Sequence, residues 1–428
     1  MRLLYTLLTV LALPLIFGRL WWRGRRNPEY RLRWGERLGR YGFPASAQHC
    51  MVFHAVSVGE VHGAMPLIEA FLGRHPQVPV VVTTTTPTGS LRVRQLLGKR
   101  VRHVYLPYDL PWCARSFLRQ FNPQILVLLE TELWPNLLNQ CQLHQCPVLL
   151  VNARLSLKSF ASYQRIAGLA RMMMQQLTLV SAQASADGER FIKLGLPAQH
   201  LVVAGSLKFD IAVQQEKLAA GRKIRAGWHR PVWIAASTRD GEDALMLTIH
   251  KKLLNKVPDL LLVLVPRHPE RFRSAQEKAI ARGLHCVKQS DNPVVGPDIQ
   301  VLVGDTLGDM NFYYALADLA FVGGSLVPKG CQNIIEAAAM GLPVLTGPSL
   351  FNFQSASEAL CAAGAMQVVA DASELGQAVL GLLMNADRRQ TMAQQASAVV
   401  AANTGATLRT LELIERYCSN NLIASAID

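Results

Sequence analysis

The stretch "PQILVLLETELWPN", residues 123–136, decides the fold class. Its first half is apolar enough to be a buried strand, and a strand without a polar face is typical of a parallel sheet covered by helices on both sides. Two carboxylates, Glu130 and Glu132, follow directly, and Trp134 and Pro135 come next. Charges at the end of a buried strand could cap a helix, repel a partner, bind a metal or take part in chemistry.

The same pattern recurs along the chain, where short β-rich runs alternate with helical segments. One series ends near residue 210 and a second begins near residue 228, so the pattern predicts an α/β protein with two doubly wound, Rossmann-like domains and a cleft between them. The predicted segments are a membrane anchor at 1–26, a first domain at 27–210, a linker at 211–227, a second domain at 228–405 and a C-terminal helix at 406–428. Ligands of such sheets bind beyond the carboxyl ends of the strands, so residues at strand ends are the candidates for function.

Size and composition agree with this organisation. A chain of 428 residues is too long for one ordinary core, and 50% hydrophobic with 17% charged residues is typical of a globular protein. The eight cysteines form no CxxC pair and have no matching zinc-ligand pair nearby. We therefore expect free thiols in a reducing compartment, and no metal site.

The N-terminus carries the strongest charge asymmetry. The net charge is +14, and residues 1–40 contribute +7 of it from nine Arg and two Glu. An apolar run, Leu3–Gly18, precedes most of these arginines, and with "RLWW" it reaches about twenty residues, the length of a membrane span. Trp21 and Trp22 stand where interfacial anchors are common.

This arrangement predicts a single membrane anchor. No small-residue cleavage site precedes the arginines, which argues against a removable signal peptide, and the positive-inside rule keeps the flanking arginines and the bulk of the protein cytoplasmic. The following segment, residues 27–42, has aromatic residues at near-helical spacing among arginines, which suits an anionic membrane surface. Charge alone also suggests a nucleic-acid binder, but half of the charge belongs to the membrane segment, so we expect no nucleic acid partner.

Three motifs at strand ends of the first domain carry candidate chemistry. Glu60 follows Gly59 at a helix start, where it is either stabilised by the helix dipole or acts as a general base. Lys208 follows a strand and Gly205, and is either a surface lysine or a cation for a phosphate or carboxylate. The loop "TTTTPTGS", residues 83–90, offers hydroxyls to an anion but lacks the lysine of a P-loop.

The second domain has its own candidates. Arg267 and His268 follow its most apolar strand, where an arginine suits bidentate phosphate recognition. "GDTLGDM" places Gly308 and Asp309 in a tight loop before a helix.

The stretch "GGSLVPKGCQNIIEAAAMGLPVL" reads as a glycine-rich loop, a helix and a strand. Asn333 and Glu336 stand at helix-capping spacing, which is one interpretation. The other is that free amides at the helix start bind a phosphate while Glu336 holds a ribose diol.

Together these motifs resemble the 3-deoxy-D-manno-oct-2-ulosonic acid (Kdo) transferases of lipopolysaccharide assembly. The matching pieces occur in the family's order between about residues 30 and 355: "SVGE", "TTTTPTGS", "ETELWPN", "NARLS", "GSLKFD", "PRHPERF", "GDTLGDM", "QNIIEAAAMGLPVLTGP" and "FNF". "ETELWPN" and "PRHPERF" are the most specific of them.

The resemblance implies a GT-B type glycosyltransferase on the cytoplasmic face of the inner membrane. Such enzymes move Kdo from CMP-Kdo to the lipid A precursor (lipid IVA), with no cofactor. The family's catalytic base falls on Glu60 and its transition-state stabilising positions on Glu130 and Lys208. Its CMP contacts fall on Arg267, His268, Leu307, Gly308, Asp309, Asn333, Ile334, Ile335 and Glu336.

The chain departs from the family pattern at two places. The family usually reads Gly-Gly-His-Asn before the nucleotide helix, where this chain has Gly330-Cys331-Gln332-Asn333. It usually reads Gly-Pro-His further on, where this chain has Ser349 as the third residue. The alternative function is a sugar-nucleotide epimerase of similar two-domain build, which would need no membrane anchor. For Glu132, we expect a role in ordering its loop or in contacting the acceptor.

Overall fold

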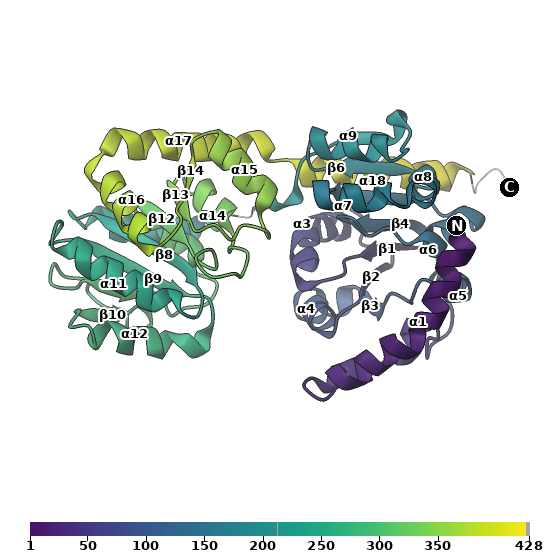
Figure 1. Cartoon of the computed structure of the whole chain (residues 1–428), viewed down its shortest axis with the longest axis horizontal. Coiled ribbons are helices and arrows are strands. Elements are labelled where there is room, and N and C mark those ends of the chain that lie inside the picture. Colours follow the sequence, from purple (N-terminus) through teal and green to yellow (C-terminus); the bar gives the residue numbers. More distant parts are fainter. Residues whose placement is uncertain (212, 425–428) are drawn as a thin grey trace. The chain divides into compact units, whose positions relative to one another are not determined.

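The chain folds into two compact units, each built around its own parallel sheet. The computed structural model describes residues 1–211 and 213–424, with side chains described up to residue 418. The first unit is Met1–Asp210 together with the segment from Thr404 onward, and the second is Ile211–Asn403. Each unit holds a seven-stranded sheet with helices on both faces (Figure 1). The predicted pair of doubly wound α/β domains is confirmed.

The first sheet has the strand order β3-β2-β1-β4-β5-β6-β7, and every pairing in it is parallel. Its strands are β1 (Cys50–His54), β2 (Val80–Thr84), β3 (Arg102–Tyr105), β4 (Pro123–Leu129), β5 (Val148–Ala153), β6 (Leu179–Ala182) and β7 (Leu201–Val203). The apolar run in the first half of residues 123–136 is therefore strand β4, at the centre of the sheet. Its side chains are buried except for Gln124, which is half-buried.

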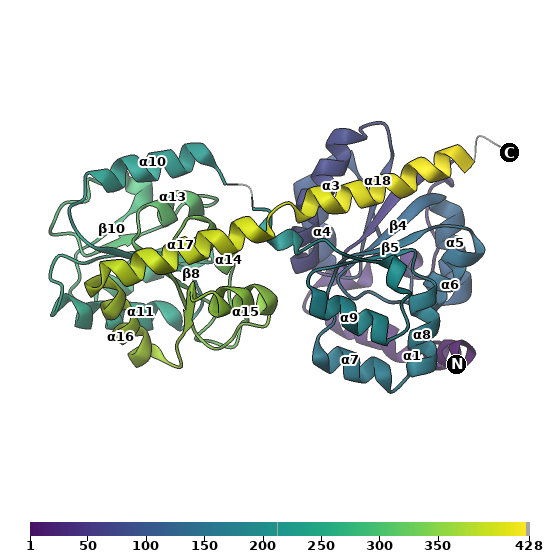
Figure 2. The same ribbon diagram turned by 90° about the horizontal axis from the view of Figure 1, so that it is seen from above.

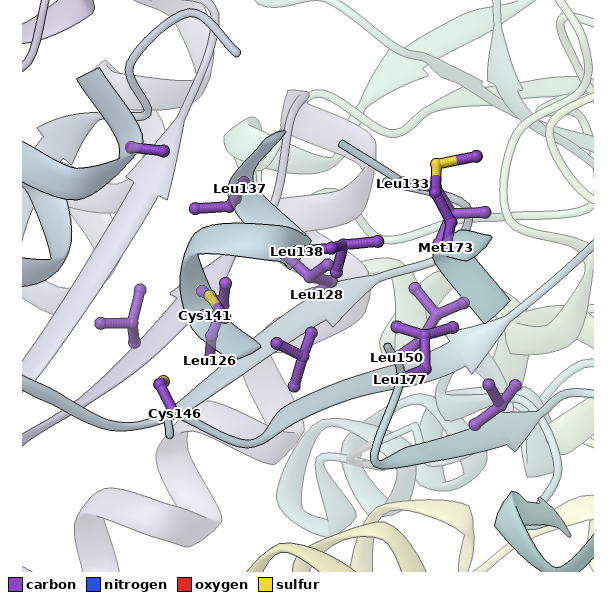
Figure 3. Close-up of a cluster of buried hydrophobic side chains, with 14 of the residues drawn as sticks. Leu126, Leu128, Leu133, Leu137, Leu138, Cys141, Cys146, Leu150, Met173 and Leu177 are labelled. Carbon is purple, nitrogen blue, oxygen red and sulfur yellow. The ribbon is translucent and has the colours of Figure 1, made fainter. Parts of the chain in front are cut away.

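Period-two alternation divides the core of this unit between the two faces of the sheet. The main helices of the unit are α3 (Val58–Arg74), α4 (Pro87–Leu97), α5 (Pro111–Phe121), α6 (Pro135–Leu143), α7 (Leu157–Gln164), α8 (Ala167–Gln175), α9 (Ser185–Lys193) and α18 (Ala406–Ala424). Leu126 and Leu128 of β4 point to the face covered by α5, α6 and α8 (Figure 3). Ile125 and Val127 point to the other face, where they join the cluster formed by α3, α4 and α18.

The C-terminal helix α18 belongs to the first unit. It lies alongside α3 (Figure 2) and places Leu411 and Ile414 in that unit's core. The backbone N–H groups of Gly405 and Thr407 donate to the carboxylate of Asp210, at 2.6 and 2.5 Å, which fixes the start of the helix.

The second sheet has the order β10-β11-β9-β8-β12-β13-β14 and is also parallel throughout. Its strands are β8 (Val232–Thr238), β9 (Leu261–Pro266), β10 (Cys286–Lys288), β11 (Val301–Val303), β12 (Leu319–Val322), β13 (Val344–Thr346) and β14 (Met366–Val368). The helices are α10 (Gln215–Ala226), α11 (Glu242–Leu254), α12 (Phe272–Ile280), α13 (Met310–Ala315), α14 (Ile334–Ala339), α15 (Gln354–Ala362), α16 (Ala372–Met384) and α17 (Ala386–Asn403).

Helix α10 fills most of the segment expected to be a linker, and it packs against α13 within the second unit. Gly221 permits this contact, because a Cβ there would lie 2.6 Å from the Cβ of Ala315 and from the carbonyl oxygen of Phe312. The polar sequence of α10 reflects its exposed face, and only Leu218 and Gly221 are buried.

Within the described part of the chain, one helix, α1 (Arg2–Arg23), is long and apolar enough to cross a membrane by length and composition, with a mean hydropathy of 1.9. It is the candidate anchor of the chain. The short helices η1 (Pro28–Arg31) and α2 (Trp34–Arg37) follow it and lead into the first sheet.

Candidate functional site

Glu60 stands in the first turn of α3, directly after the carboxyl end of β1. Ser57 is the N-cap of this helix, and its hydroxyl accepts a hydrogen bond from the Glu60 N–H at 3.4 Å. The Glu60 carboxylate accepts in return from the Val56 N–H at 2.8 Å and from the Ser57 hydroxyl at 3.0 Å. The reciprocal bonds are a variant of the capping box. These bonds hold the Glu60 carboxylate in one place at the helix start.

Glu130 is the first residue after β4, and its backbone is left-handed with φ of 57°. Such a backbone is uncommon for residues other than glycine and often marks a functional site. The neighbouring strand stabilises it, because the Glu130 N–H donates to Val151 and its carbonyl accepts from Arg154. The Thr131 hydroxyl also donates to the carbonyl of Arg154. The turn after β4 is thus tied to the end of β5.

Lys208 reaches this turn from the far end of the sheet. It lies in the short helix η4 (Leu207–Phe209), and its ammonium is 3.3 Å from a carboxylate oxygen of Glu130. Both side chains are only about a quarter exposed. Asn152, also left-handed with φ of 51°, accepts a hydrogen bond from the Leu207 N–H at 3.1 Å and so positions the turn that carries the lysine.

Glu60 and Glu132 both have raised pKa values. Burial, together with the smaller effect of the Glu130 charge, raises the pKa of Glu60 to about 7, although the hydrogen bond from Val56 acts to lower it. Burial also raises the pKa of Glu132 to about 7, and the charges of Glu60 and Glu130 add to the effect. Lys208 lowers the pKa of Glu60 by a smaller amount. The structure therefore brings together the three predicted residues Glu60, Glu130 and Lys208, and adds Glu132.

Two carboxyls with pKa values near 7 are suited to proton transfer at neutral pH. We expect Glu132→Gln to shift the acid limb of the pH–rate profile to lower pH. The reason is that the Coulomb repulsion between Glu60 and Glu132 acts on both carboxyls. Glu60 therefore ionises more easily once the negative charge of Glu132 is gone. The measurement is kcat/KM between pH 5 and 9. A general base acts only when it is ionised, so kcat/KM rises with pH through the pKa of the base.

The matched control is Glu189→Gln, which removes an exposed carboxylate from α9 and should leave the limb unchanged. An acid limb that stays in place in Glu132→Gln would show that the two groups do not interact during the reaction.

The hydroxyls of the threonine loop after β2 make hydrogen bonds within the first unit. Thr86 is the N-cap of α4 and accepts from the Gly89 N–H at 3.1 Å. The Thr84 hydroxyl lies 2.9 Å from Nε2 of His103, and the Thr85 hydroxyl donates to the Val56 carbonyl at 3.3 Å. These hydroxyls hold the loop together and support the turn that precedes Glu60.

In the second unit, basic groups gather at the carboxyl ends of β8 and β9. Arg267 and His268 follow β9, and the guanidinium of Arg239, after β8, lies 2.5 Å from Nε2 of His268. Burial lowers the pKa of His268 and the nearby charge of Arg239 lowers it further. Burial also lowers the pKa of Arg239, and repulsion from Arg267 and Arg271 adds to it. Several like charges held close together form a site suited to a phosphate.

Glu242 organises the glycine-rich loop beside these arginines. Its carboxylate is fully buried and accepts from the N–H groups of Arg239 and Gly324, both at 2.7 Å. It also accepts from the N–H groups of Ser325 and Leu326, at 3.2 and 3.1 Å. Gly323 permits this close approach, since a Cβ there would lie 2.6 Å from the Cα of Thr238.

We expect Glu242→Gln to destabilise the second unit by about 1–3 kcal/mol, because a neutral amide leaves some of these buried N–H groups without an acceptor. Nucleotide affinity should fall as well, since the loop loses its support. Thermal unfolding and titration calorimetry with CMP measure the two effects. The control is Glu277→Gln, whose side chain is 60% exposed; a loss of equal size in both variants would contradict the role of Glu242.

Asn333 and Glu336 lie at the start of α14 in the arrangement of a helix cap. The Asn333 side chain accepts from the Ile335 N–H at 3.1 Å and donates to the Glu336 carboxylate at 3.0 Å. Burial raises the pKa of Glu336, against the effects of Asn333 and of the Arg267 charge. The side chains of Ile334 and Ile335 are fully buried, so only their backbone could touch a ligand.

Leu307, Gly308 and Asp309 form the loop after β11, the strand next to β9. Leu307 is 68% exposed and Gly308 is left-handed with φ of 82°. Lys217 of α10 pairs with the Asp309 carboxylate at 2.7 Å and donates to the Gly308 carbonyl at 2.9 Å. Burial acts to raise the pKa of Asp309, but the hydrogen bonds from Lys217 and Thr306 outweigh it, so the pKa lies below its ordinary value.

The departures from the family pattern are accommodated locally. Cys331 is buried and adopts the left-handed region, with φ of 66°, at the position where the family usually has glycine. The Ser349 hydroxyl accepts from the Gly330 N–H at 2.9 Å, which ties the two altered loops together.

Sequence reasoning missed Arg239 and Glu242. The signal was present as "STRDGED", a polar turn after an apolar strand that places both residues at the carboxyl edge. The apolar run predicts the strand, but nothing in the turn by itself marks a binding site.

Comparison with known proteins now adds to this geometry. The family model described as "3-Deoxy-D-manno-octulosonic-acid transferase (kdotransferase)" matches residues 32–211. A 3-deoxy-D-manno-octulosonic acid transferase of Haemophilus influenzae is 38% identical and covers 98% of this chain and 100% of its own. One from Bordetella pertussis is 40% identical, over 96% of this chain and 98% of its own. The crystal structure of MurG from Acinetobacter baumannii shares the fold, with a TM-score of 0.58 at 15% identity over 86% of this chain and 99% of its own.

Proposed function

This chain belongs to the 3-deoxy-D-manno-octulosonic acid (Kdo) transferase family and is therefore a glycosyltransferase, and we propose that it moves Kdo from CMP-Kdo to a glucosamine hydroxyl of the lipid A precursor, lipid IVA. The observation that carries the mechanism is the grouping of Glu60, Glu130, Glu132 and Lys208 at one edge of the first sheet. Family membership also decides against the sugar-nucleotide epimerase considered from the sequence.

Glu60 is the general base in this proposal. It takes the proton from the acceptor hydroxyl as the hydroxyl oxygen forms a bond to the anomeric carbon of Kdo. The bond from that carbon to the CMP phosphate oxygen breaks, and attack from the opposite face inverts the centre. The raised pKa of Glu60, about 7, supports this role because a base works best when its pKa lies near the working pH.

Glu130 and Lys208 stabilise the charges that develop. The transition state of glycosyl transfer carries positive, oxocarbenium-like charge on the sugar, which a fixed carboxylate stabilises. Lys208 pairs with Glu130 at 3.3 Å and holds it in place, and its ammonium can also attract the carboxylate of Kdo or the leaving phosphate.

The second unit supplies the donor contacts. Arg267 and Arg239 face the CMP phosphate, His268 is held beside Arg239, and Glu336 accepts from a ribose hydroxyl. The loop at Leu307–Asp309 and the backbone of Ile334 and Ile335 complete the set carried over from the family. These groups balance the charge of the leaving phosphate in place of a metal ion. The enzyme works at the cytoplasmic side of the inner membrane, where α1 is the candidate anchor.

Mass spectrometry of a tetraacylated lipid A precursor, incubated with the protein and freshly generated CMP-Kdo, tests this function. The expected product is heavier by a whole number of Kdo residues, and CMP is released in the same amount. We expect the same product in excess EDTA. Release of free sugar with no change in the lipid would contradict the proposal.

A further inference from the structure

One side of helix α1 lies against the first unit. Its side chains alternate between exposed and half-buried or buried with a helical period. The packed side includes Tyr5, Thr6, Thr9, Val10, Leu13, Ile16, Phe17 and Leu20. The exposed side includes Leu3, Leu4, Leu7, Leu8, Leu11 and Leu15, the leucine row, whose members are 55–81% exposed. A helix that stands away from a domain would show no such period.

Contacts hold both ends of α1 against the unit. Near its start, the Thr6 hydroxyl lies 3.1 and 3.0 Å from the amide oxygen and nitrogen of Asn136 in α6. Near its end, the ring of Phe17 packs against Trp34 and Tyr108, with centroids 5.1 and 5.7 Å apart. A span needs about twenty residues surrounded by lipid. The contacts at Thr6 and at Phe17 leave no free stretch of that length in the helix.

The exposed side of α1 differs from that of a surface helix in water. Such a helix exposes a polar side. In α1 the two hydroxyls lie on the packed side among apolar side chains, with Thr6 bonded to Asn136 and Thr9 bonded to the Tyr5 carbonyl at 2.9 Å. The exposed side is the leucine row. An apolar environment outside the protein is the partner that fits this side.

Cationic groups stand at the end of the leucine row. A pocket of about 410 Å³ at the C-terminal end of α1 is lined by Trp22, Arg23, Arg25, Arg26, Asn27 and Tyr30. Aromatic rings hold its guanidinium groups, with Arg23 4.4 Å above Tyr30 and Arg25 4.8 Å above Trp21. Arginines with interfacial tryptophans are the combination that binds an anionic membrane surface.

We propose that α1 is an in-plane membrane helix, and that the pocket at its end binds the phosphate headgroup of an anionic phospholipid. The leucine row enters the boundary between headgroups and acyl chains, while the packed side stays on the protein. The chain then lies on one leaflet and does not cross the bilayer. The proposal sharpens the expectation of an anchor and does not depend on the transfer chemistry, so it can fail while the proposed function holds.

The depth of α1 in a bilayer distinguishes a helix that lies in the plane of the membrane from one that spans it. Leu4→Cys and Leu15→Cys, each labelled with a fluorophore, are made in the full chain with Cys286, Cys361 and Cys418 changed to serine. Lipids brominated at different acyl positions then report the depth of each label. A spanning helix would place the two labels about 16 Å apart in depth, since each residue rises about 1.5 Å. We expect equal, shallow depths.

A depth difference near 16 Å would overturn the proposal, as would a lack of quenching at both positions, which would point to a second copy covering the leucine row. An unlabelled sample with unchanged thermal unfolding shows that each variant is folded.

The pocket is tested with vesicles of phosphatidylcholine with and without phosphatidylglycerol. We expect the triple variant Arg23→Gln, Arg25→Gln and Arg26→Gln to bind the anionic vesicles roughly a hundredfold more weakly, because each arginine near such a surface contributes about a factor of five. Binding to the zwitterionic vesicles should change little. The control removes the same charge from exposed sites of the second unit, with Lys252→Gln, Lys256→Gln and Arg273→Gln.

Equal losses in the two triple variants would contradict a dedicated headgroup site. Inorganic phosphate that competes as well as the vesicles do would show an anion site without a lipid preference, and would equally overturn the assignment.

Discussion

Glu60→Gln should lower the rate of Kdo transfer by roughly 10²–10⁴, because glutamine cannot accept the proton of the acceptor hydroxyl. The amide still fits the helix cap, since its oxygen can accept from the Val56 N–H as the carboxylate does. CMP binding should therefore remain, because the donor contacts are expected in the second unit. Single-turnover transfer to a lipid A precursor measures the rate, and calorimetry with CMP measures the binding.

A matched control is available on the same helix. Glu69→Gln removes a carboxylate that pairs with Arg100 at the surface, with 41% of its side chain exposed, and should leave the rate within a factor of two or so. Near wild-type turnover in Glu60→Gln would reject Glu60 as the base. A fall in CMP affinity of the same size as the fall in rate would point to misfolding instead.

The second large effect is expected at Lys208. Lys208→Met keeps the length of the side chain and removes its charge, and we expect transfer to slow by roughly 10²–10³, the usual effect of removing one stabilising donor. Lys208 also lowers the pKa of Glu60, so the Glu60 carboxyl is easier to protonate once the lysine charge is gone. The acid limb of the pH–rate profile should become broader or move upward in pH, which a loss of packing would not produce.

Lys193→Met serves as the comparison, since this lysine lies exposed at the end of α9 in the same unit. An unchanged rate in Lys208→Met would leave its ion pair with a structural role alone. The double variant Lys208→Met with Glu130→Gln shows whether the two residues act together. If they do, the fold-loss in transfer rate of the double variant is smaller than the product of the two single losses.

The fold and much of the first-unit site could be predicted because parallel sheets place strand ends at one edge. Strands β1 and β4 are neighbours in the sheet, and this pairing brings the strand ends that carry Glu60 and Glu130 to adjacent places. Lys208 comes from β7 at the opposite end of the sheet. Its approach to Glu130 depends on the turn held by Asn152, which periodicity does not reveal.

Other features depend on tertiary contacts that no local pattern contains. Glu132 was the weaker choice from the sequence, because strand alternation says nothing about a turn whose first residue has φ of 57°. Burial and the carboxylates of Glu60 and Glu130 raise the pKa of Glu132. These neighbours come from the ends of different strands. Likewise, the four N–H groups around Glu242 come from loops more than eighty residues apart.

The hydrogen bonds between Thr6 and Asn136 have a consequence for which lipids can be modified. Asn136 ends the stretch that carries Glu130 and Glu132, so the same few residues connect α1 to these two carboxylates. With α1 lying in the leaflet as proposed, the carboxylates stand at a fixed height above the acyl chains. The enzyme then reaches only sugar hydroxyls at one distance from the bilayer, and the acceptor need not leave the membrane to be modified.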